Sequence, residues 1–331
     1  MKTLLHICLL ITYILLPIHA QQAPIPPINT THSLEKPGII RLKQDKNTQL
    51  LLATCSVNGV KCQMIVDTAA SHTTFHSGFI DKHFPTIKRI KAPIAPGSNV
   101  KTVPDIFPLN EVNIGNFHIK NCLGLCLDLS PLISQFTDTP VVGILGMNYM
   151  GLRPFRLSAT NKTLEFLTEK NYPQRGLHEL HSSLRRTQIF TIHCQREGNK
   201  FPLLLDSGSS LSFAPKAHWP IDETAKPIVT QTTDINGKEA DSIIMKRGII
   251  SDLKLGENYT LHNAQFIVDS SHPTGKRNQI GVDTLSKGVD VLLDVPNKKV
   301  YAMKAERHDS TPKKNKRGIK NYPSLINHHF Y

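Results

Sequence analysis

The sequence has almost no segment in which apolar residues recur at helical spacing, and this absence excludes a helical bundle. It also has no apolar run beyond residue 20 that is long enough to cross a membrane as a helix. Charged residues make up 20% and hydrophobic residues 39% of the 331 residues, so the composition is globular and not disordered. What is present is a series of β-rich runs separated by turns, which predicts an all-β chain with room for two domains.

Motifs for metals and cofactors are missing as well. His178 and His181 lie at i and i+3, whereas a zinc-binding helix needs histidines at i and i+4. A solvated connection is the simpler interpretation of this stretch, and we expect neither a metal nor a cofactor.

Residues 1–20 have the pattern of a cleaved secretory signal peptide. Lys2 supplies the positive start, an apolar run extends from Leu4 to Ile18, and the small residue Ala20 suits cleavage. An uncleaved anchor is the alternative, but the run is shorter than the ~20 residues that a spanning helix needs. We therefore expect a secreted or periplasmic protein without a membrane span.

Cysteine is scarce, and five cysteines, an odd number, remain once the signal peptide is removed. Two of them, Cys55 and Cys62, flank Asn58-Gly59, the favoured pair for a two-residue hairpin turn. Counting outward from the turn places the two cysteines opposite each other, within disulfide reach. We predict a Cys55–Cys62 disulfide, and two buried free thiols are the alternative.

Two stretches of the chain share one layout. Residues 64–71 (Met-Ile-Val-Asp-Thr-Ala-Ala-Ser) and 203–210 (Leu-Leu-Leu-Asp-Ser-Gly-Ser-Ser) each lead an apolar strand into an aspartate and then into a turn of small residues. The two aspartates, Asp67 and Asp206, are 139 positions apart. Each motif alone is common turn chemistry, so turn-capping carboxylates that happen to recur are the alternative interpretation.

Other landmarks recur at nearly the same offset, which predicts a duplicated β-rich unit. Cys194 precedes Asp206 by 12 positions, as Cys55 precedes Asp67, and the glycine of Ile114-Gly115 is matched by that of Leu255-Gly256. The expected organisation is a signal peptide at 1–20, an extended N-terminal arm at 21–48, a first lobe at 49–167, a linker at 168–188, a second lobe at 189–303 and a basic tail at 304–331.

If the two units pack about a pseudo-twofold axis, the two carboxyl groups lie side by side in a cleft. Carboxylates that close cannot both ionise easily, so they share one proton. One acid then acts as a general base toward water and the other as an acid toward a carbonyl, and the pair titrates as a unit. We expect Thr68 and Ser207 to donate hydrogen bonds across the axis, and Ser71 and Ser210 to hydrogen-bond the carboxylates.

Four glycines complete the predicted site. Gly146 and Gly281 end buried strands beneath the acid loops, where the lack of a Cβ permits close backbone contact. Gly97 and Gly237 mark exposed hairpins that we interpret as flaps over an extended peptide, which would pair with them as an added β-strand.

These motifs resemble those of the aspartic endopeptidases of the pepsin and retropepsin superfamily, from about Leu50 to about Met303. Asp206-Ser207-Gly208 matches the Asp-Thr/Ser-Gly motif of the family, and the strands that end at Gly146 and Gly281 are similar to its buried segments. The symmetric halves look more like two fused retropepsin-type units than a full-length pepsin. The resemblance implies a bilobal fold of two pseudo-twofold-related β-barrel-like lobes with an active-site cleft between them, and catalysis by two aspartates that share a proton.

The sequence also departs from the family. Ala69 stands where the family has glycine, and its methyl group would crowd the reacting water or the substrate. The flap candidate at residues 93–104 contains no tyrosine, and Asn148 replaces the acid found at Asp283. These departures bear on activity more than on the fold.

The expected function is that of a secreted aspartic endopeptidase, a monomer that hydrolyses extended or unfolded peptides at acidic pH. One alternative is a catalytically impaired homologue in which Ala69 blocks turnover and the cleft binds peptides. The other is a secreted adhesion protein whose lysine-rich tail binds polyanions, since the net charge is +13. No specific nucleic-acid site is expected.

Overall fold

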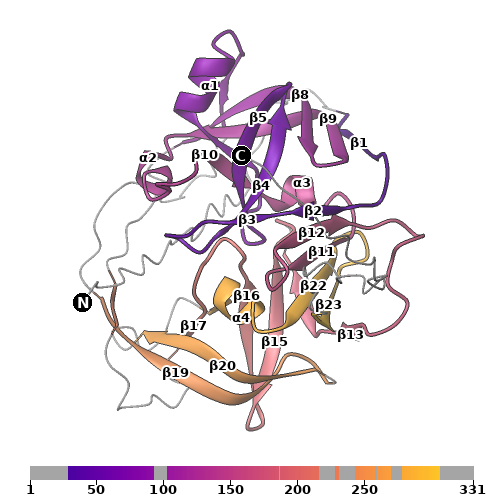
Figure 1. The fold of residues 1–331 in the computed structure, drawn as a ribbon, viewed down its shortest axis with the longest axis vertical. Coiled ribbons are helices and arrows are strands. Elements are labelled where there is room, and N and C mark those ends of the chain that lie inside the picture. Colours follow the sequence, from indigo (N-terminus) through magenta and orange to yellow (C-terminus); the bar gives the residue numbers. More distant parts are fainter. Residues whose placement is uncertain are drawn as a thin grey trace, which may run out of the picture.

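The computed structural model describes residues 29–92, 103–185, 187–215, 228–230, 243–257, 259–269 and 278–305. Strands dominate these residues, and the helices among them are short (Figure 1). The helices are α1 (Ser77–His83), α2 (Ser130–Ile133), α3 (Met147–Met150) and α4 (Val282–Leu285). The prediction of an all-β fold is confirmed. No helix of the described residues is long and apolar enough to span a membrane.

A nine-stranded sheet holds most of the first half of the chain. Its strands are β1 (Thr31–Leu34), β3 (Lys43–Gln44), β4 (Leu51–Val57), β5 (Val60–Val66), β6 (Thr74–His76), β7 (Ile90–Lys91), β8 (Asp105–Ile114), β9 (Phe117–Leu127) and β10 (Val141–Leu145). β10 lies between β5, to which it is parallel, and β6, to which it is antiparallel. The last three residues of β5 are fully buried, so the end of this strand is fixed by the core.

An eight-stranded sheet repeats this arrangement in the second half. Its strands are β14 (Ser182–Leu184), β15 (Phe190–Arg196), β16 (Asn199–Leu205), β17 (Phe213–Pro215), β18 (Ile228–Thr230), β19 (Ile243–Lys254), β20 (Thr260–Asp269) and β21 (Gln279–Ile280). β21 is parallel to β16 and antiparallel to β17, as β10 is to β5 and β6. The two sheets form the two lobes, upper and lower in Figure 1.

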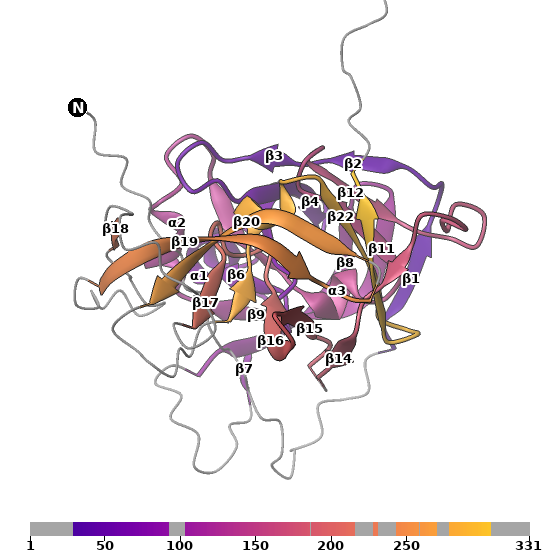
Figure 2. The same ribbon diagram turned by 90° about the horizontal axis from the view of Figure 1, so that it is seen from below.

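A six-stranded sheet joins the lobes (Figures 1 and 2). Its order is β13 (His178–Glu179), β23 (Lys299–Lys304), β22 (Val289–Asp294), β11 (Phe155–Ser158), β12 (Thr163–Phe166) and β2 (Ile39–Arg41). The antiparallel pair of β11 and β22, with Leu157 opposite Val291, is the seam between the halves. Strands on either side of it correspond, which gives the sheet the pseudo-twofold symmetry that the duplication predicts. The bilobal aspartic-protease-like fold is confirmed.

Two segments expected to be simple connections contribute strands. The described part of the arm at 21–48 carries β1, β2 and β3, which pair with β9, β12 and β4. The linker at 168–188 carries β13 and β14, which pair with β23 and β15. Backbone hydrogen bonds therefore fasten both segments to the sheets, while the lobe boundaries stay a prediction.

The hairpin of β4 and β5 has the predicted turn and register. Asn58 (φ 43°) and Gly59 (φ 85°) both have the positive φ that a type I′ turn requires, and Cys55 lies opposite Cys62. Both cysteines are buried free thiols, so the predicted disulfide is wrong for this structure. Opposed pairs alternate between hydrogen-bonded and non-hydrogen-bonded outward from the turn, which makes this a hydrogen-bonded pair, with side chains farther apart.

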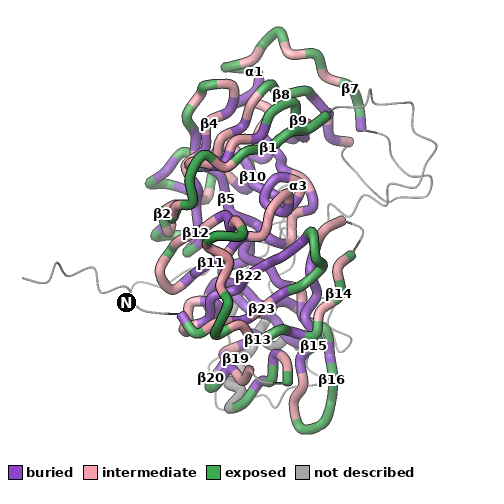
Figure 3. Tube along the Cα trace, turned by 90° about the vertical axis from the view of Figure 1, so that its right-hand side faces the viewer, coloured by how far each residue is buried: buried purple, intermediate pink, exposed green. Residues whose placement is uncertain are grey.

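Burial follows the strands into the centre of each lobe (Figure 3). The strands that precede the two aspartates, β5 and β16, begin at the surface and become buried toward the ends that carry the acid loops, whereas the arm strands β1 and β2 are largely exposed. The two acid loops therefore start from the core of each lobe.

Candidate active site

Asp67 and Asp206 each follow a buried strand. The backbone N–H of Asp67, after β5, donates to the carbonyl oxygen of Leu145 in β10 at 3.1 Å. The N–H of Asp206, after β16, donates to the carbonyl oxygen of Ile280 in β21 at 3.0 Å. The neighbouring parallel strand thus fixes the backbone of each aspartate in the same way.

The residues after the two aspartates are hydrogen-bonded crosswise. The N–H of Thr68 donates to Oγ of Ser207 at 3.1 Å, and the N–H of Ser207 donates to Oγ1 of Thr68 at 3.0 Å. The Thr68 hydroxyl donates to the carbonyl oxygen of Leu205, and the Ser207 hydroxyl to that of Val66, both at 2.8 Å. These four buried hydrogen bonds lock the two loops across the axis and bring the two aspartates together.

The carboxyl groups of the two aspartates are buried, with Asp67 0% and Asp206 3% exposed. Oδ1 of Asp67 accepts hydrogen bonds from the N–H groups of Ala69 at 2.7 Å and Ala70 at 3.0 Å. Asp206 accepts backbone hydrogen bonds from Gly208 and Ser209, the equivalent residues of its own loop. Oδ2 of Asp67 and Oδ1 of Asp206 have no hydrogen-bond partner among the described residues. Buried carboxylate oxygens without a donor are uncommon, so these two lack the hydrogen bonds that a bound water or a substrate would supply.

Burial is the largest influence on the acidity of both groups. It raises the pKa of Asp206 well above its usual value, the neighbouring Asp67 raises it further, and backbone hydrogen bonds oppose both effects. Burial raises the pKa of Asp67 to about 6, against the lowering effect of the hydrogen bonds from Ala69 and Ala70. Two buried acids with raised pKa values hold a proton between them in acidic solution.

Gly146 and Gly281 lie against the acid loops, as the sequence predicts. A Cβ on Gly146 would lie 2.6 Å from the backbone carbonyl carbon of His72, and a Cβ on Gly281 would lie 2.4 Å from the carbonyl oxygen of Leu211. Backbone atoms cannot yield cheaply, so only glycine fits at either position.

Gly208 lies directly against the other lobe's acid. A Cβ on Gly208 would lie 2.3 Å from both Cγ and Oδ2 of Asp67. Ala69 is the corresponding residue of the first loop, so the pseudo-twofold symmetry predicts that its Cβ faces the region of Asp206. The two loops are therefore alike in their backbone hydrogen bonds to the aspartates, and they differ in the residue that follows Thr68 and Ser207.

Two supporting residues were missed in the sequence, Thr73 and Ser212. Thr73 donates to Oδ1 of Asn148 from its N–H at 2.7 Å and from its hydroxyl at 2.9 Å, and its Oγ1 accepts a hydrogen bond from the N–H of Gly146. The Ser212 hydroxyl donates to Oδ1 of Asp283 at 2.6 Å, and its Oγ accepts a hydrogen bond from the N–H of Gly281. Asn148 therefore does with an amide oxygen what Asp283 does with a carboxylate. The signal that could have found them is their separation, which is again 139 positions.

The predicted roles of Ser71 and Ser210 are wrong. The Ser71 hydroxyl lies 2.9 Å from Nδ1 of His72, whose pKa is lowered by burial. Neither serine hydroxyl bonds a carboxylate in the described part of the chain. The flap candidates Gly97 and Gly237 lie outside the described residues, so their role stays a prediction.

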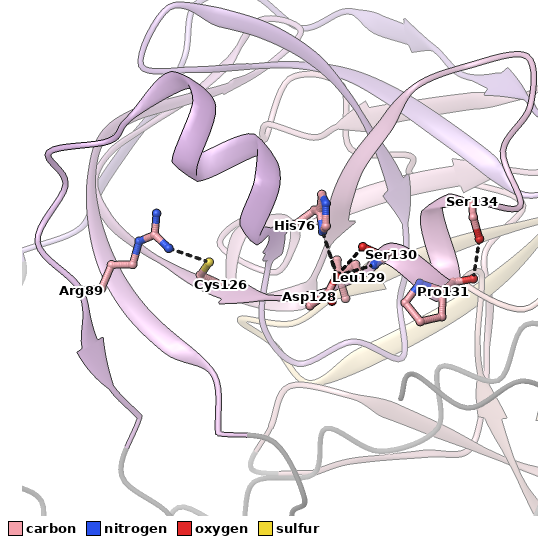
Figure 4. Close-up of polar contacts among 8 residues, drawn as sticks. All are labelled: His76, Arg89, Cys126, Asp128, Leu129, Ser130, Pro131 and Ser134. Atoms are coloured by element: carbon pink, nitrogen blue, oxygen red, sulfur yellow. Dashed lines mark hydrogen bonds and ion pairs between the residues drawn. The ribbon is translucent and has the colours of Figure 1, made fainter. Parts of the chain in front are cut away.

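A second group of polar contacts joins β6, β9 and α2 (Figure 4). Nδ1 of His76 accepts a hydrogen bond at 3.1 Å from the backbone N–H that precedes α2, and Oδ1 of Asp128 accepts from the N–H and the hydroxyl of Ser130. Arg89 donates to Sγ of Cys126 at 3.7 Å, and burial raises the pKa of that thiol. No cluster able to hold a metal occurs in the described residues. These contacts fasten elements of the first lobe, and a protonated thiol is a poor nucleophile.

Comparisons with known proteins found one family match and a number of similar solved structures. Residues 53–149 match the family described as aspartyl protease. A solved structure titled edgp, for which no organism is stated, aligns with 85% of this chain and 96% of its own at a TM-score of 0.51 and 11% identity. The structure of basic 7S globulin from soybean aligns with 84% of this chain and 95% of its own, at a TM-score of 0.48 and 10% identity. The structure of a retropepsin-like aspartic protease from Rickettsia conorii aligns with 41% of this chain and 92% of its own, at a TM-score of 0.28 and 22% identity. No curated protein matches the chain in sequence.

Proposed function

We propose that this chain is a secreted aspartic endopeptidase that acts at acidic pH, a proposal supported by the match of residues 53–149 to the aspartyl protease family and by the bilobal fold. The observation that carries the proposal is the pair of buried, partnerless oxygens, Oδ2 of Asp67 and Oδ1 of Asp206, at loops that are locked together by four hydrogen bonds. An acid pair held this rigidly in the core costs stability, and such pairs usually serve chemistry.

The reaction follows from the shared proton. One carboxylate accepts a proton from a bound water as the water oxygen attacks the carbonyl carbon of the peptide, and the protonated partner donates its proton to the carbonyl oxygen. In the collapse of the tetrahedral intermediate the C–N bond breaks and a C=O bond re-forms. The acid that took the proton from water gives it to the leaving amine, and a hydroxyl of the intermediate returns its proton to the other carboxylate, so the pair again holds one proton. Because the two acids titrate as a unit, neither is assigned one role. The raised pKa values keep one proton on the pair up to weakly acidic pH, which supports an acidic optimum.

The alternative function is that of a peptide-binding protein with impaired catalysis. Ala69 favours it, because the opposite loop has glycine at the equivalent position and its Cβ space is taken by Asp67. A methyl group directed toward Asp206 would occupy volume that the reacting water or substrate carbonyl needs. In that case the cleft would still bind an extended peptide, without turnover.

The test is the rate of cleavage of an unfolded protein and of a peptide library by the mature chain, measured from pH 3 to pH 8. The variants Asp67→Asn and Asp206→Asn keep the shape of the side chain and remove its ionisation. We expect each to lower the rate by about 10²–10⁴-fold, the usual contribution of a general acid or base. Wild-type cleavage by either variant, or cleavage unaffected by a pepstatin-like inhibitor, would show that the acids are not the catalytic groups.

Ala69→Gly separates the two functions. If the wild type is an active enzyme, the substitution changes turnover little. If the wild type is a peptide-binding homologue, glycine restores room at the acid pair, and turnover appears where the wild type has none.

A further inference from the structure

The second lobe carries a surface hollow away from the acid pair. It has a volume of about 450 Å³ and lies where β15, β16 and β19 meet. Lys200, near the start of β16, lines the hollow, whereas Asp206 follows the end of the same strand. Asp206 is six positions after Lys200 along an extended strand, which is roughly 20 Å.

Two rows of side chains form the wall of the hollow. Gln195 on β15 lies opposite Lys200 on β16 and also opposite Lys254 on β19. Directly opposed residues point to the same face of a sheet, so a lysine stands on each side of the glutamine. His193, two residues earlier on β15, belongs to the same face, and its N–H donates to the carbonyl oxygen of His181 at 2.7 Å.

The charge in the hollow is unbalanced. Glu257 is the one acid among the described residues that line it, and its Oε1 lies 3.4 Å from Nε2 of His181. Lys200 and Lys254 are exposed, and neither takes part in an ion pair with a carboxylate of the described residues. Two ammonium groups that flank a neutral amide repel each other, and an anion between them relieves the repulsion.

We propose that this hollow binds a multivalent oxyanion, a ligand with two or more phosphate or sulfate groups. The two lysines lie two strand spacings apart, about 10 Å, so each can hold a different anionic group of one ligand. The side-chain amide of Gln195 adds hydrogen-bond donors between them. The proposal is independent of the proposed protease function, because none of these residues touches the acid loops.

The experiment is isothermal titration calorimetry of the full mature chain with inorganic tripolyphosphate and, separately, with a sulfated heparin tetrasaccharide. Lys200→Gln/Lys254→Gln removes the two cations of the hollow. Lys61→Gln/Lys120→Gln is the matched control, because it removes the same charge from exposed lysines of the first lobe. The basic tail is present in every variant, so it cannot account for a difference between them.

We expect the variant of the hollow to bind at least about tenfold more weakly than the wild type, and the control to bind about as well as it does. Lys200→Arg/Lys254→Arg should retain the affinity, and circular dichroism checks that each variant is folded. Binding of one probe alone identifies the anionic group as phosphate or sulfate. Equal weakening in the hollow and control variants, or no saturable binding of either probe, would overturn the proposal.

Discussion

Gly208 offers the sharpest test of the acid pair, because a methyl group there would meet the carboxyl group of the other lobe. The added Cβ would lie 2.3 Å from Cγ of Asp67, whereas real Cβ atoms essentially never come closer than 3.0 Å, so something must move by at least about 0.7 Å, the difference of the two. The carboxyl group is fully buried and held by the N–H groups of Ala69 and Ala70 at 2.7 and 3.0 Å. A shift of this size would break these hydrogen bonds and displace the carboxyl group from its place beside Asp206.

A misplacement of about 1 Å at a reacting group costs roughly 100-fold in rate, or about 2.7 kcal/mol. We therefore expect Gly208→Ala to lower kcat for peptide cleavage at the pH optimum by about this factor, with KM little changed. Overpacking also lowers stability by about 1–3 kcal/mol, so Tm is measured first and the assay is run well below it.

Ala69→Gly is the matched control, because it is the opposite change at the equivalent position of the other loop. It removes a methyl group from beside the acid pair, so it should not lower kcat. A Gly208→Ala protein that cleaves peptides as fast as the wild type would refute the packing argument. Equal losses in the two variants would also refute it, because they would show a general effect of loop conformation.

Three further predictions concern the stability of the acid loops. The pKa of Asp67 is raised from 3.8 to about 6, so the contribution of this group to the free energy of unfolding should be present in full below about pH 4 and be lost as the pH rises through about 6. The Tm of the wild type minus that of Asp67→Asn, followed from pH 3.5 to 7.5, should therefore fall with rising pH. A difference in Tm that does not change with pH would contradict this prediction. Thr68→Val leaves two buried backbone groups unpaired and should cost about 2–4 kcal/mol in urea unfolding, whereas Thr68→Ser keeps the hydroxyl, and equal costs would show that the hydrogen bonds do not matter. Gly146→Ala sets a Cβ 2.6 Å from the backbone of His72 and should lower stability by at least about 1–3 kcal/mol in thermal unfolding, with an unchanged Tm as the contrary result.

The features that local chemistry determines could be predicted from the sequence. The Asn58-Gly59 turn sets the register of its hairpin, so the opposition of Cys55 and Cys62 follows from counting. The crosswise bonding of Thr68 and Ser207 follows from the equal spacing of two strand-borne aspartates, because a duplicated unit must place equivalent loops at its axis.

Features that depend on contacts with distant parts of the chain could not be predicted. β1 and β2 are short, largely exposed edge strands without apolar alternation, and their pairing is decided by the free edges of β9 and β12. The disulfide prediction failed for a different, local reason: Cys55 and Cys62 are opposed but form a hydrogen-bonded pair, in which the side chains stand farther apart. The spacing of Ser71 from Asp67 does not reveal the neighbouring imidazole, and only the coordinates show that the Ser71 hydroxyl is hydrogen-bonded with Nδ1 of His72.

The differences between the two halves lie in side chains, while the backbone pattern is shared. The N–H of Met147 donates to the carbonyl oxygen of Ala70 at 2.8 Å, and that of Val282 donates to Ser209 at 2.9 Å, so strand, loop and helix are joined alike in both lobes. Asn148 preserves this pattern because an amide oxygen accepts the same hydrogen bonds as a carboxylate. Ala69 has no such equivalence, because its N–H bonds Asp67 as a glycine would while its methyl group adds volume beside the acid pair. The fold therefore accommodates both Ala69 and Asn148, and we expect the chemistry to depend on Ala69, where the difference from the second lobe is steric.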